Sequence, residues 1–206
     1  MSRRIDYYFT LVSPWAWLGH DAFLDIARRH GLAVRFRPVL LNKVFPESGG
    51  LPLAQRHPLR QRYRLMELQR WREARGLPLN IHPKYWPFDV AAADRLVVAA
   101  QMAGADAGRL AGLLFRAVFV DERDPGQRQT LAEILAEGGF DADLLARAET
   151  ETVARLYDAT PAKALAAGVF GSPSWVLDGE VFWGQDRLEL LEAALNSGRK
   201  AYSADL

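Results

Sequence analysis

The stretch Ser13-Pro-Trp-Ala-Trp-Leu-Gly19 is the most informative part of the sequence, and it comes just after an apolar run from Ile5 to Thr10. The β-branched and aromatic residues of that run predict a buried strand. Pro14 suits the first position of a helix, because its missing N–H would have no partner there. Leu18 and Ala22 continue at helical spacing. The sequence therefore predicts a strand, a serine hydroxyl at its end, and a helix that begins beside this hydroxyl.

A second strand completes a β-α-β unit. Gly31 is predicted to end the helix, since glycine readily takes the left-handed conformation found there. The segment from Ala33 to Leu41 alternates around Val34, Phe36 and Val39, and this alternation predicts a strand. From Leu53 to about Leu165 the pattern is predominantly helical.

Strands return in the last fifth of the chain. Ser174 to Leu177 and Glu180 to Trp183 flank an Asp178-Gly179 pair, which is the strongest short signal for a hairpin. The last helix has the pattern of a capping box, Asp186-Arg-Leu-Glu189, and Gly198 is predicted to end it. The order β-α-β, helical block, β-β-α predicts an α/β thioredoxin-like fold. Its thioredoxin-like domain would comprise residues 1–50 and 166–206, with residues 51–165 as an all-helical insertion.

Composition excludes several classes of function. The 206 residues carry a net charge of only +1, which argues against a dedicated nucleic-acid binder. The chain has no cysteine, so it has no disulfide, no thiolate metal site and no redox couple of its own. No secretory signal and no run of eighteen apolar residues is found, so we expect a cytoplasmic protein without a membrane partner.

Ser13 is the first candidate for chemistry, because the start of a helix has free N–H groups and a partial positive charge. An anion such as a thiolate suits this place, and without cysteine the thiol must come from outside, with glutathione the obvious candidate. Lowering a thiol pKa from about 8.5 to about 6.5 requires roughly 2.7 kcal/mol. A helix terminus supplies at best about 2 kcal/mol, and a hydrogen bond to a charged group about 1.5–3 kcal/mol. Together they suffice, so we interpret Ser13 as a thiolate-stabilising donor; the alternative is a simple helix cap.

Two downstream segments would complete such a site. A cis Ser172-Pro173 bond would aim the backbone of Ser172 at the site, where it could pair with a peptide-like ligand as a strand does; the alternative is an ordinary turn proline. The segment Gly184-Gln-Asp-Arg187 has helix N–H groups for a carboxylate, and the Asp186 carboxylate suits an ammonium. The γ-glutamyl end of glutathione carries both, although Asp186 could instead be only a helix cap.

Other polar residues are interpreted as structural. The four histidines have no metal-ligand spacing, so no metal site is predicted. A hydrolase that pairs His20 with Ser13 is disfavoured because the Gly-x-Ser-x-Gly motif is absent. Seven arginines between Gln55 and Arg75 are interleaved with apolar residues, which predicts a solvated face opposite a packing stripe, with a funnel for anionic substrates as the alternative; the stripe comprises Leu59, Tyr63 and Met66.

The chain resembles the 2-hydroxychromene-2-carboxylate isomerases, a glutathione-dependent family related to kappa-class glutathione transferases and periplasmic disulfide oxidoreductases. The resemblance covers nearly the whole chain. It rests on the stretch from Ser13 to Gly19, on Leu68-Gln-Arg-Trp71, on His82-Pro-Lys-Tyr-Trp-Pro87 and above all on the stretch from Val169 to Leu188.

The resemblance implies a site and a reaction. Ser13 would be the catalytic serine that holds the glutathione sulfur. The thiolate would add to a conjugated carbon of a hydroxychromene carboxylate, the ring would open, a bond would rotate, and elimination would release glutathione and a trans-o-hydroxybenzylidenepyruvate-like product. The resemblance also implies a homodimer. It places Ser172, Gln185, Asp186 and Arg187 on glutathione, and Asn42, Lys43, Arg56, Lys84 and Tyr85 around the aromatic carboxylate substrate.

Two rival functions stay open. A kappa-class-like transferase would consume glutathione one-for-one with product, whereas an isomerase would regenerate it. A non-catalytic thioredoxin-like binding protein would have lost its cysteines and with them its chemistry.

Overall fold

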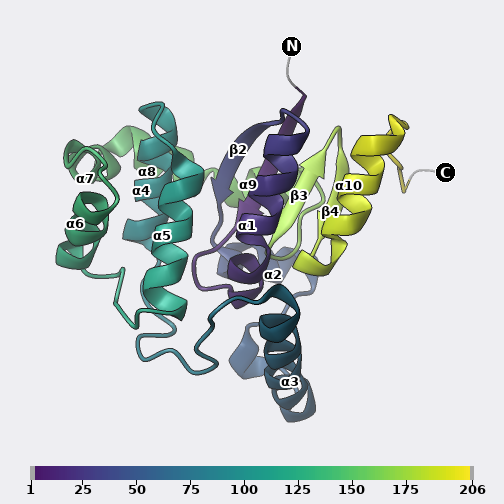
Figure 1. Cartoon of the computed structure of the whole chain (residues 1–206), viewed down its shortest axis with the longest axis horizontal. Helices are drawn as coiled ribbons and strands as arrows, with labels where there is room; N and C mark the ends of the chain where they lie inside the picture. Colours follow the sequence, from purple (N-terminus) through teal and green to yellow (C-terminus); the bar gives the residue numbers. More distant parts are fainter. Residues whose placement is uncertain (1–2, 205–206) are drawn as a thin grey trace.

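Four strands form one sheet in the order β2-β1-β3-β4 in the computed structural model, which describes residues 3–204 (Figure 1). β1 (Arg4–Phe9) is central and pairs in parallel with β2 (Ala33–Pro38). On its other side β1 pairs antiparallel with β3 (Ser174–Leu177), which forms a hairpin with β4 (Glu180–Trp183). This sheet confirms the predicted thioredoxin-like α/β fold.

Helices cover both faces of the sheet. α1 (Pro14–Arg29) and α10 (Leu188–Ser197) lie on one face, and α2 (Leu41–Ser48) and α9 (Thr160–Ala166) lie on the other (Figure 1). A group of helices packs beside β2, namely α4 (Ala91–Met102), α5 (Ala107–Phe119), α6 (Arg128–Glu137), α7 (Asp143–Ala148) and α8 (Glu151–Asp158).

α3 (Pro58–Arg75) lies apart from this group, below the edge where β1 and β2 end, and follows a short 3-10 turn, Leu53–Gln55 (Figure 1). The prediction that Leu59, Tyr63 and Met66 form a packing stripe is wrong, because all three side chains are exposed. Helical spacing shows which residues share a face of a helix, but it does not show which face packs against the rest of the protein. On α3 only Leu68 is fully buried.

Three other element predictions need correction. The second strand ends at Pro38, and the helix α2 that follows was missed, because Pro46 in its short sequence disfavours a helix. The capping box at Asp186 is also wrong. The chain forms a 3-10 turn over Gln185–Arg187, α10 begins at Leu188, and no side chain caps it. The predicted hairpin is confirmed, with positive φ at Asp178 and Gly179 as the tight primed turn requires.

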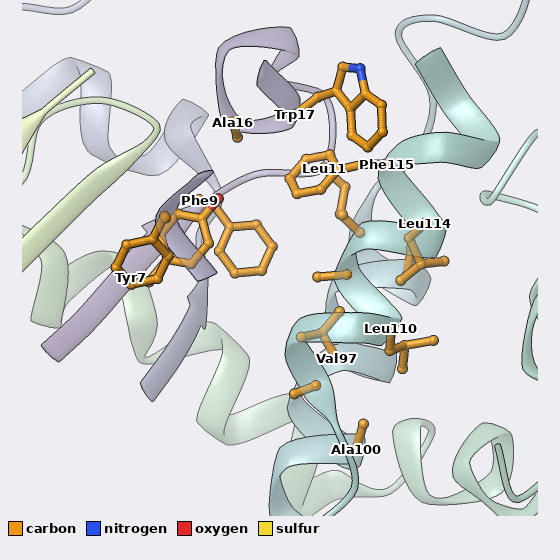
Figure 2. Packing of buried hydrophobic residues seen from close by; sticks show 14 of the residues in the cluster. Tyr7, Phe9, Leu11, Ala16, Trp17, Val97, Ala100, Leu110, Leu114 and Phe115 are labelled. Carbon is orange, nitrogen blue, oxygen red and sulfur yellow. The ribbon is translucent and has the colours of Figure 1, made fainter. Parts of the chain in front are cut away.

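The buried core joins the sheet to the helical group (Figure 2). Tyr7 and Phe9 point to the same side of β1, with ring centroids 4.7 Å apart, and Phe9 meets Phe115 of α5 at 5.7 Å. Tyr8 points to the opposite face, where it packs with Val39 and other residues in a smaller cluster. Leu11, in the loop after β1, is fully buried in the main core. The loop that leads to Ser13 therefore rests on a closely packed base.

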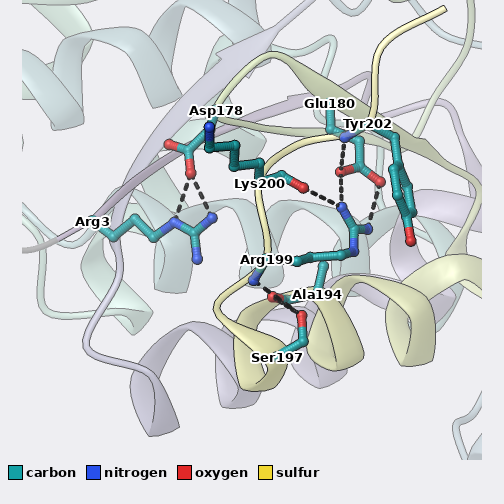
Figure 3. Close-up of polar contacts among 8 residues, drawn as sticks. All are labelled: Arg3, Asp178, Glu180, Ala194, Ser197, Arg199, Lys200 and Tyr202. Atoms are coloured by element: carbon teal, nitrogen blue, oxygen red, sulfur yellow. Dashed lines mark hydrogen bonds and ion pairs between the residues drawn. The ribbon is translucent and has the colours of Figure 1, made fainter.

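The C-terminal segment is held against β4 by one arginine (Figure 3). Arg199 donates to both carboxylate oxygens of Glu180, at 2.7 and 2.8 Å, and its guanidinium lies 3.7 Å from the ring centroid of Tyr202. The Tyr202 N–H also donates to Glu180. Arg3, just before β1, forms an ion pair with Asp178 in the hairpin turn. These contacts lie at the opposite end of the strands from Ser13.

A buried carboxyl on α4 predicts a pH-dependent stability. Asp94 is fully buried and accepts a hydrogen bond of 2.7 Å from the Tyr157 hydroxyl. Burial raises the pKa of the Asp94 carboxyl well above its ordinary value, and the opposing hydrogen bond from Tyr157 is the smaller effect. The neutral form is therefore the one that the fold favours.

We expect Asp94→Asn to become progressively more stable than the wild type as the pH rises. A pKa raised by folding contributes stability that is present below the unfolded value, about 3.9, and is lost as the pH rises through the folded value. Between these two pKa values the wild type should lose up to about 1.4 kcal/mol per pH unit relative to the uncharged variant, and above the folded pKa the loss levels off. Urea unfolding of both proteins at pH 5 and pH 9 measures this, and an equal stability difference at both pH values would contradict it.

A membrane-spanning helix is absent from residues 3–204, because none of their helices combines sufficient length with sufficient apolar character. No group of three or more histidine, aspartate or glutamate side chains in this range lies together as metal ligands do.

Candidate active site

Ser13 stands at the start of α1 as predicted. Its backbone is extended, and its Oγ accepts a hydrogen bond of 3.2 Å from the Ala16 N–H, so the side chain caps the helix. Its hydroxyl donates to the carbonyl oxygen of Ser172 at 3.4 Å, which is at the long end for a hydrogen bond between oxygens. The two roles of the hydroxyl are compatible, since its oxygen accepts one bond while its proton is donated to a different group.

Ser172 approaches Ser13 from the loop before β3. The Ser172-Pro173 bond is cis, which confirms the prediction. The carbonyl of Ser172 faces the Ser13 hydroxyl, and its own Oγ accepts from the Thr10 N–H at 3.1 Å. The Ser172 N–H has no hydrogen-bond partner within the described part of the chain. The residues that the sequence places 159 positions apart are thus brought together, and one backbone donor there stays available to a ligand.

Side chains from distant segments hold the loop between β1 and Ser13. Besides Ser172, which binds Thr10, the indole Nε1–H of Trp86 donates to the carbonyl of Val12 at 2.7 Å. The Ser13 N–H closes the loop with a bond of 3.0 Å to the Thr10 carbonyl. Trp86 lies in the His82-to-Pro87 stretch, but nothing in the local pattern indicates that it would anchor this loop.

His20 does not assist Ser13. It is fully buried about two turns further along α1, where Nε2 lies 2.9 Å from the Gly108 carbonyl and Nδ1 lies 3.5 Å from the Tyr7 hydroxyl. Burial lowers the pKa of His20, so the ring is held neutral at neutral pH. The hydrolase interpretation is therefore excluded for this pair.

The turn from Gln185 to Arg187 packs directly on α1. A Cβ added to Gly19 would lie 2.8 Å from the Cβ of Gln185, so only glycine at this position allows the approach. Gln185 is buried, and its side chain is occupied: Arg75 of α3 donates to Oε1 at 2.8 and 3.0 Å and to its carbonyl oxygen at 2.9 Å.

The neighbouring charges of this turn stay exposed. Asp186 pairs with Arg187 at 2.5 Å, and both side chains are close to half exposed. Asp186 and Arg187 therefore present a carboxylate and a guanidinium to solvent, whereas Gln185 serves to fix the turn. Arg75 was not predicted to do this, since nothing distinguishes it among seven arginines in the sequence.

The structure does not unite the residues predicted to contact the substrate. Lys43, on α2 beside Asn42, lies 3.8 Å from Asp158. Arg56 donates to the Leu51 carbonyl at 2.9 Å. Lys84 and Tyr85 form an exposed pair, 4.9 Å from ammonium to ring centroid, and the hydrogen bond that the ammonium donates to the Tyr85 oxygen raises the pKa of Lys84. Their substrate contacts stay a prediction.

A cavity of about 550 Å³ lies between α3 and the loop that contains Trp86. Its walls are mainly apolar side chains with a few polar groups, and they include Pro58, Gln61, Arg64, Leu65, His82 and Trp86. Cavities of this size and character commonly bind small organic molecules. Trp86 connects it to the loop of Ser13 through the bond to Val12.

The arrangement suits stabilisation of an anion at Ser13. A serine hydroxyl at a helix start, next to an unpaired backbone N–H, supplies donors to a negative charge. The chain has no sulfur nucleophile of its own because it lacks cysteine. The site can therefore hold a reactive anion but needs it to come from a ligand.

Comparison with known proteins places the chain among related folds. The family model described as a DSBA-like thioredoxin domain matches residues 4–196. A 2-hydroxychromene-2-carboxylate isomerase of Sphingobium xenophagum is 27% identical over 198 residues, which is 95% of this chain and 99% of the relative. Glutathione S-transferase kappa 1 of Rattus norvegicus is 24% identical, covering 92% of this chain and 89% of the relative.

A solved structure gives the same result for the fold. The structure of a selenomethionine-labelled 2-hydroxychromene-2-carboxylate isomerase matches with a TM-score of 0.78 at 24% identity, over 94% of this chain and 95% of that one. These matches confirm the predicted resemblance, including the relation to kappa-class transferases.

Proposed function

The chain belongs to the family of DSBA-like thioredoxin domains, and on this premise we propose that it is a glutathione-dependent isomerase of the 2-hydroxychromene-2-carboxylate isomerase type. The observation that carries the proposal is the pair Ser13 and Ser172, a hydroxyl at a helix start facing the backbone beside a cis proline. Relatives that are isomerases and match over nearly the full length support an enzyme of this class.

The residues fit glutathione. The donors at Ser13 and Ser172 are of the kind that a thiolate and a peptide backbone accept. From Ser13 to Gly19, where the Gln185 turn packs, α1 rises about 9 Å, and the eight bonds between the cysteinyl sulfur and the γ-glutamyl ammonium span about 10 Å when extended. One glutathione could therefore reach from the serine to Asp186 and Arg187.

Each residue has a defined part in the proposed reaction. Glutathione, when bound, supplies the nucleophilic sulfur that adds to the conjugated substrate and leaves again. Ser13 donates its hydroxyl proton in a hydrogen bond to the sulfur and keeps it ionised. Ser172 pairs with the cysteinyl backbone, while Asp186 and Arg187 hold the ammonium and carboxylate of the γ-glutamyl end.

We expect Asp186→Ala to weaken glutathione binding by about ten- to a hundredfold, because a charged hydrogen bond of about 1.5–3 kcal/mol is lost. Calorimetric titration with glutathione measures this. Glu189→Ala is the matched control, since Glu189 is an exposed acid in the first turn of α10 that the proposal does not use. An unchanged dissociation constant for Asp186→Ala would show that the γ-glutamyl end does not bind at this turn.

Two measurements separate the rivals, namely this titration and the balance of glutathione during turnover. Absence of glutathione binding to the wild type would favour the non-catalytic binding protein. Glutathione consumed one-for-one with product would favour a kappa-class-like transferase, whereas recovered glutathione supports the isomerase.

The wider setting stays a prediction. A cytoplasmic location agrees with the use of glutathione, and residues 51–165 are proposed as an insertion between the two parts of the thioredoxin-like domain. The implied homodimer is open to sedimentation velocity, where a monomer at working concentration would exclude it.

A further inference from the structure

The cavity beside α3 contains a positive charge without a negative partner. The Arg64 guanidinium lies 5.3 Å from the ring centroid of Trp86, and no carboxylate of residues 3–204 forms an ion pair with it. Burial, with a smaller contribution from the nearby charge of Arg56, lowers the pKa of Arg64 to about 10. A half-buried guanidinium is therefore held against an aromatic face and repelled by a second cation.

The other side chains that line the cavity also favour an anionic ligand with an apolar body. Arg62 and His82 add groups that can carry positive charge, and no acidic side chain of the described residues lines the walls. The apolar walls, formed by Pro58, Leu65 and Trp86 among others, suit a flat hydrocarbon body. A volume of about 550 Å³ is ample for a ligand with one or two rings.

We propose that this cavity binds a planar aromatic carboxylate, that Arg64 recognises the carboxylate, and that Arg64 and Trp86 thereby set the specificity for the second substrate. The inference rests on the proposed function for its role in catalysis. It assigns recognition to residues other than Asn42, Lys43, Lys84 and Tyr85, which the structure does not bring to this cavity. A carboxylate bound here would form an ion pair with the Arg64 guanidinium, which has no acidic partner among the described residues. Two N–H groups of a guanidinium can donate to the two oxygens of one carboxylate.

The position of the cavity supports a link to the reaction. Trp86 forms one wall and also holds the Val12 carbonyl, one residue before Ser13. A ligand that packs on Trp86 therefore lies next to the loop that presents the serine hydroxyl. Removal of Arg64 should weaken binding of the ligand without moving that loop, since Arg64 makes no hydrogen bond to the loop among the described residues.

The experiment is calorimetric titration with trans-cinnamate, without and with saturating glutathione. Cinnamamide, its uncharged analogue, and 3-cyclohexylpropanoate, a carboxylate of the same length without the flat ring, separate the two recognition elements. The variants are Arg64→Met, which removes the charge, and Arg64→Lys, which keeps the charge but not the planar fork. Arg60→Met is the matched control, because Arg60 is an exposed arginine of α3 outside the cavity.

We expect cinnamate to bind Arg64→Met about ten- to a hundredfold more weakly than the wild type, Arg64→Lys to be intermediate, and Arg60→Met to be unchanged. Cinnamamide and cyclohexylpropanoate should bind the wild type at least about tenfold more weakly than cinnamate. Circular dichroism establishes that the variants are folded.

Three results would overturn the inference. Cinnamate could fail to bind the wild type, or bind Arg64→Met equally well. Alternatively, Arg64→Met could weaken glutathione rather than cinnamate, and the carboxylate recognised would then be that of the glutathione glycine. A wild type that binds cinnamate through Arg64 but binds no glutathione would support the cavity and refute the proposed function.

Discussion

Replacing Ser13 with alanine is expected to slow turnover by about ten- to a hundredfold at neutral pH. The variant loses a hydrogen bond to a charged sulfur, worth about 1.5–3 kcal/mol. In the structure the Ser13 proton is committed only to a long bond of 3.4 Å to Ser172, so it can be redirected to a thiolate at little cost. Raising the pH should recover part of the loss, because the thiol then ionises without help.

The measurement is turnover against pH from 6 to 9 with saturating glutathione. Ser13→Thr is the matched control, because it keeps both the hydroxyl and the ability to cap α1. Loss of the cap in Ser13→Ala, where the Ala16 N–H would lose its acceptor, should cost about 0.5–2 kcal/mol of stability, which thermal unfolding measures separately. A variant equally slow at every pH would exclude thiolate stabilisation as the role of Ser13, and one as fast as the wild type would leave the residue only a helix cap.

The parts of the fold that the sequence predicts well are those specified by local chemistry. Pro14 and Ser13 mark the start of α1 because a proline and a capping hydroxyl each satisfy a particular position there. The Asp178-Gly179 turn is predictable because few residues accept positive φ. The meeting of Ser13 with Ser172 follows once the strand order is known, since β1 and β3 are neighbours.

The parts that it does not predict depend on where whole elements lie. The row Leu59, Tyr63 and Met66 has helical spacing, yet it faces solvent because α3 lies outside the sheet and the helical group. Asp186 has the pattern of a capping residue, but its neighbour Gln185 is drawn into a buried position by Arg75, and the chain turns before α10 begins. The local pattern is present in both cases, but the outcome depends on which distant parts of the chain pack against each segment.

The contact of Arg75 with Gln185 leads to the second large effect that we expect. Arg75→Met should raise the dissociation constant for glutathione at least about tenfold, although Arg75 is not proposed to touch glutathione. Its guanidinium donates to both the side chain and the backbone carbonyl of Gln185, which is 110 positions further along the sequence. Without it, two acceptors at a buried position lose their partners, and each unsatisfied group costs about 1–3 kcal/mol. The turn should relax toward water and carry Asp186 and Arg187 away from their bound positions.

A positioning role differs from a general loss of stability in its kinetics. The Michaelis constant for glutathione should rise in Arg75→Met, while turnover at saturating glutathione should stay within about threefold of the wild type, because Ser13 and Ser172 are untouched. Arg75→Lys, which keeps the charge but cannot bind both acceptors as a fork, should lie between the two. Arg70→Met is the matched control, since Arg70 is an exposed arginine of the same helix that pairs only locally with Glu67. If Arg75→Met lowers turnover and leaves the Michaelis constant unchanged, the Gln185 turn does not hold glutathione, and α3 supports the fold rather than the site.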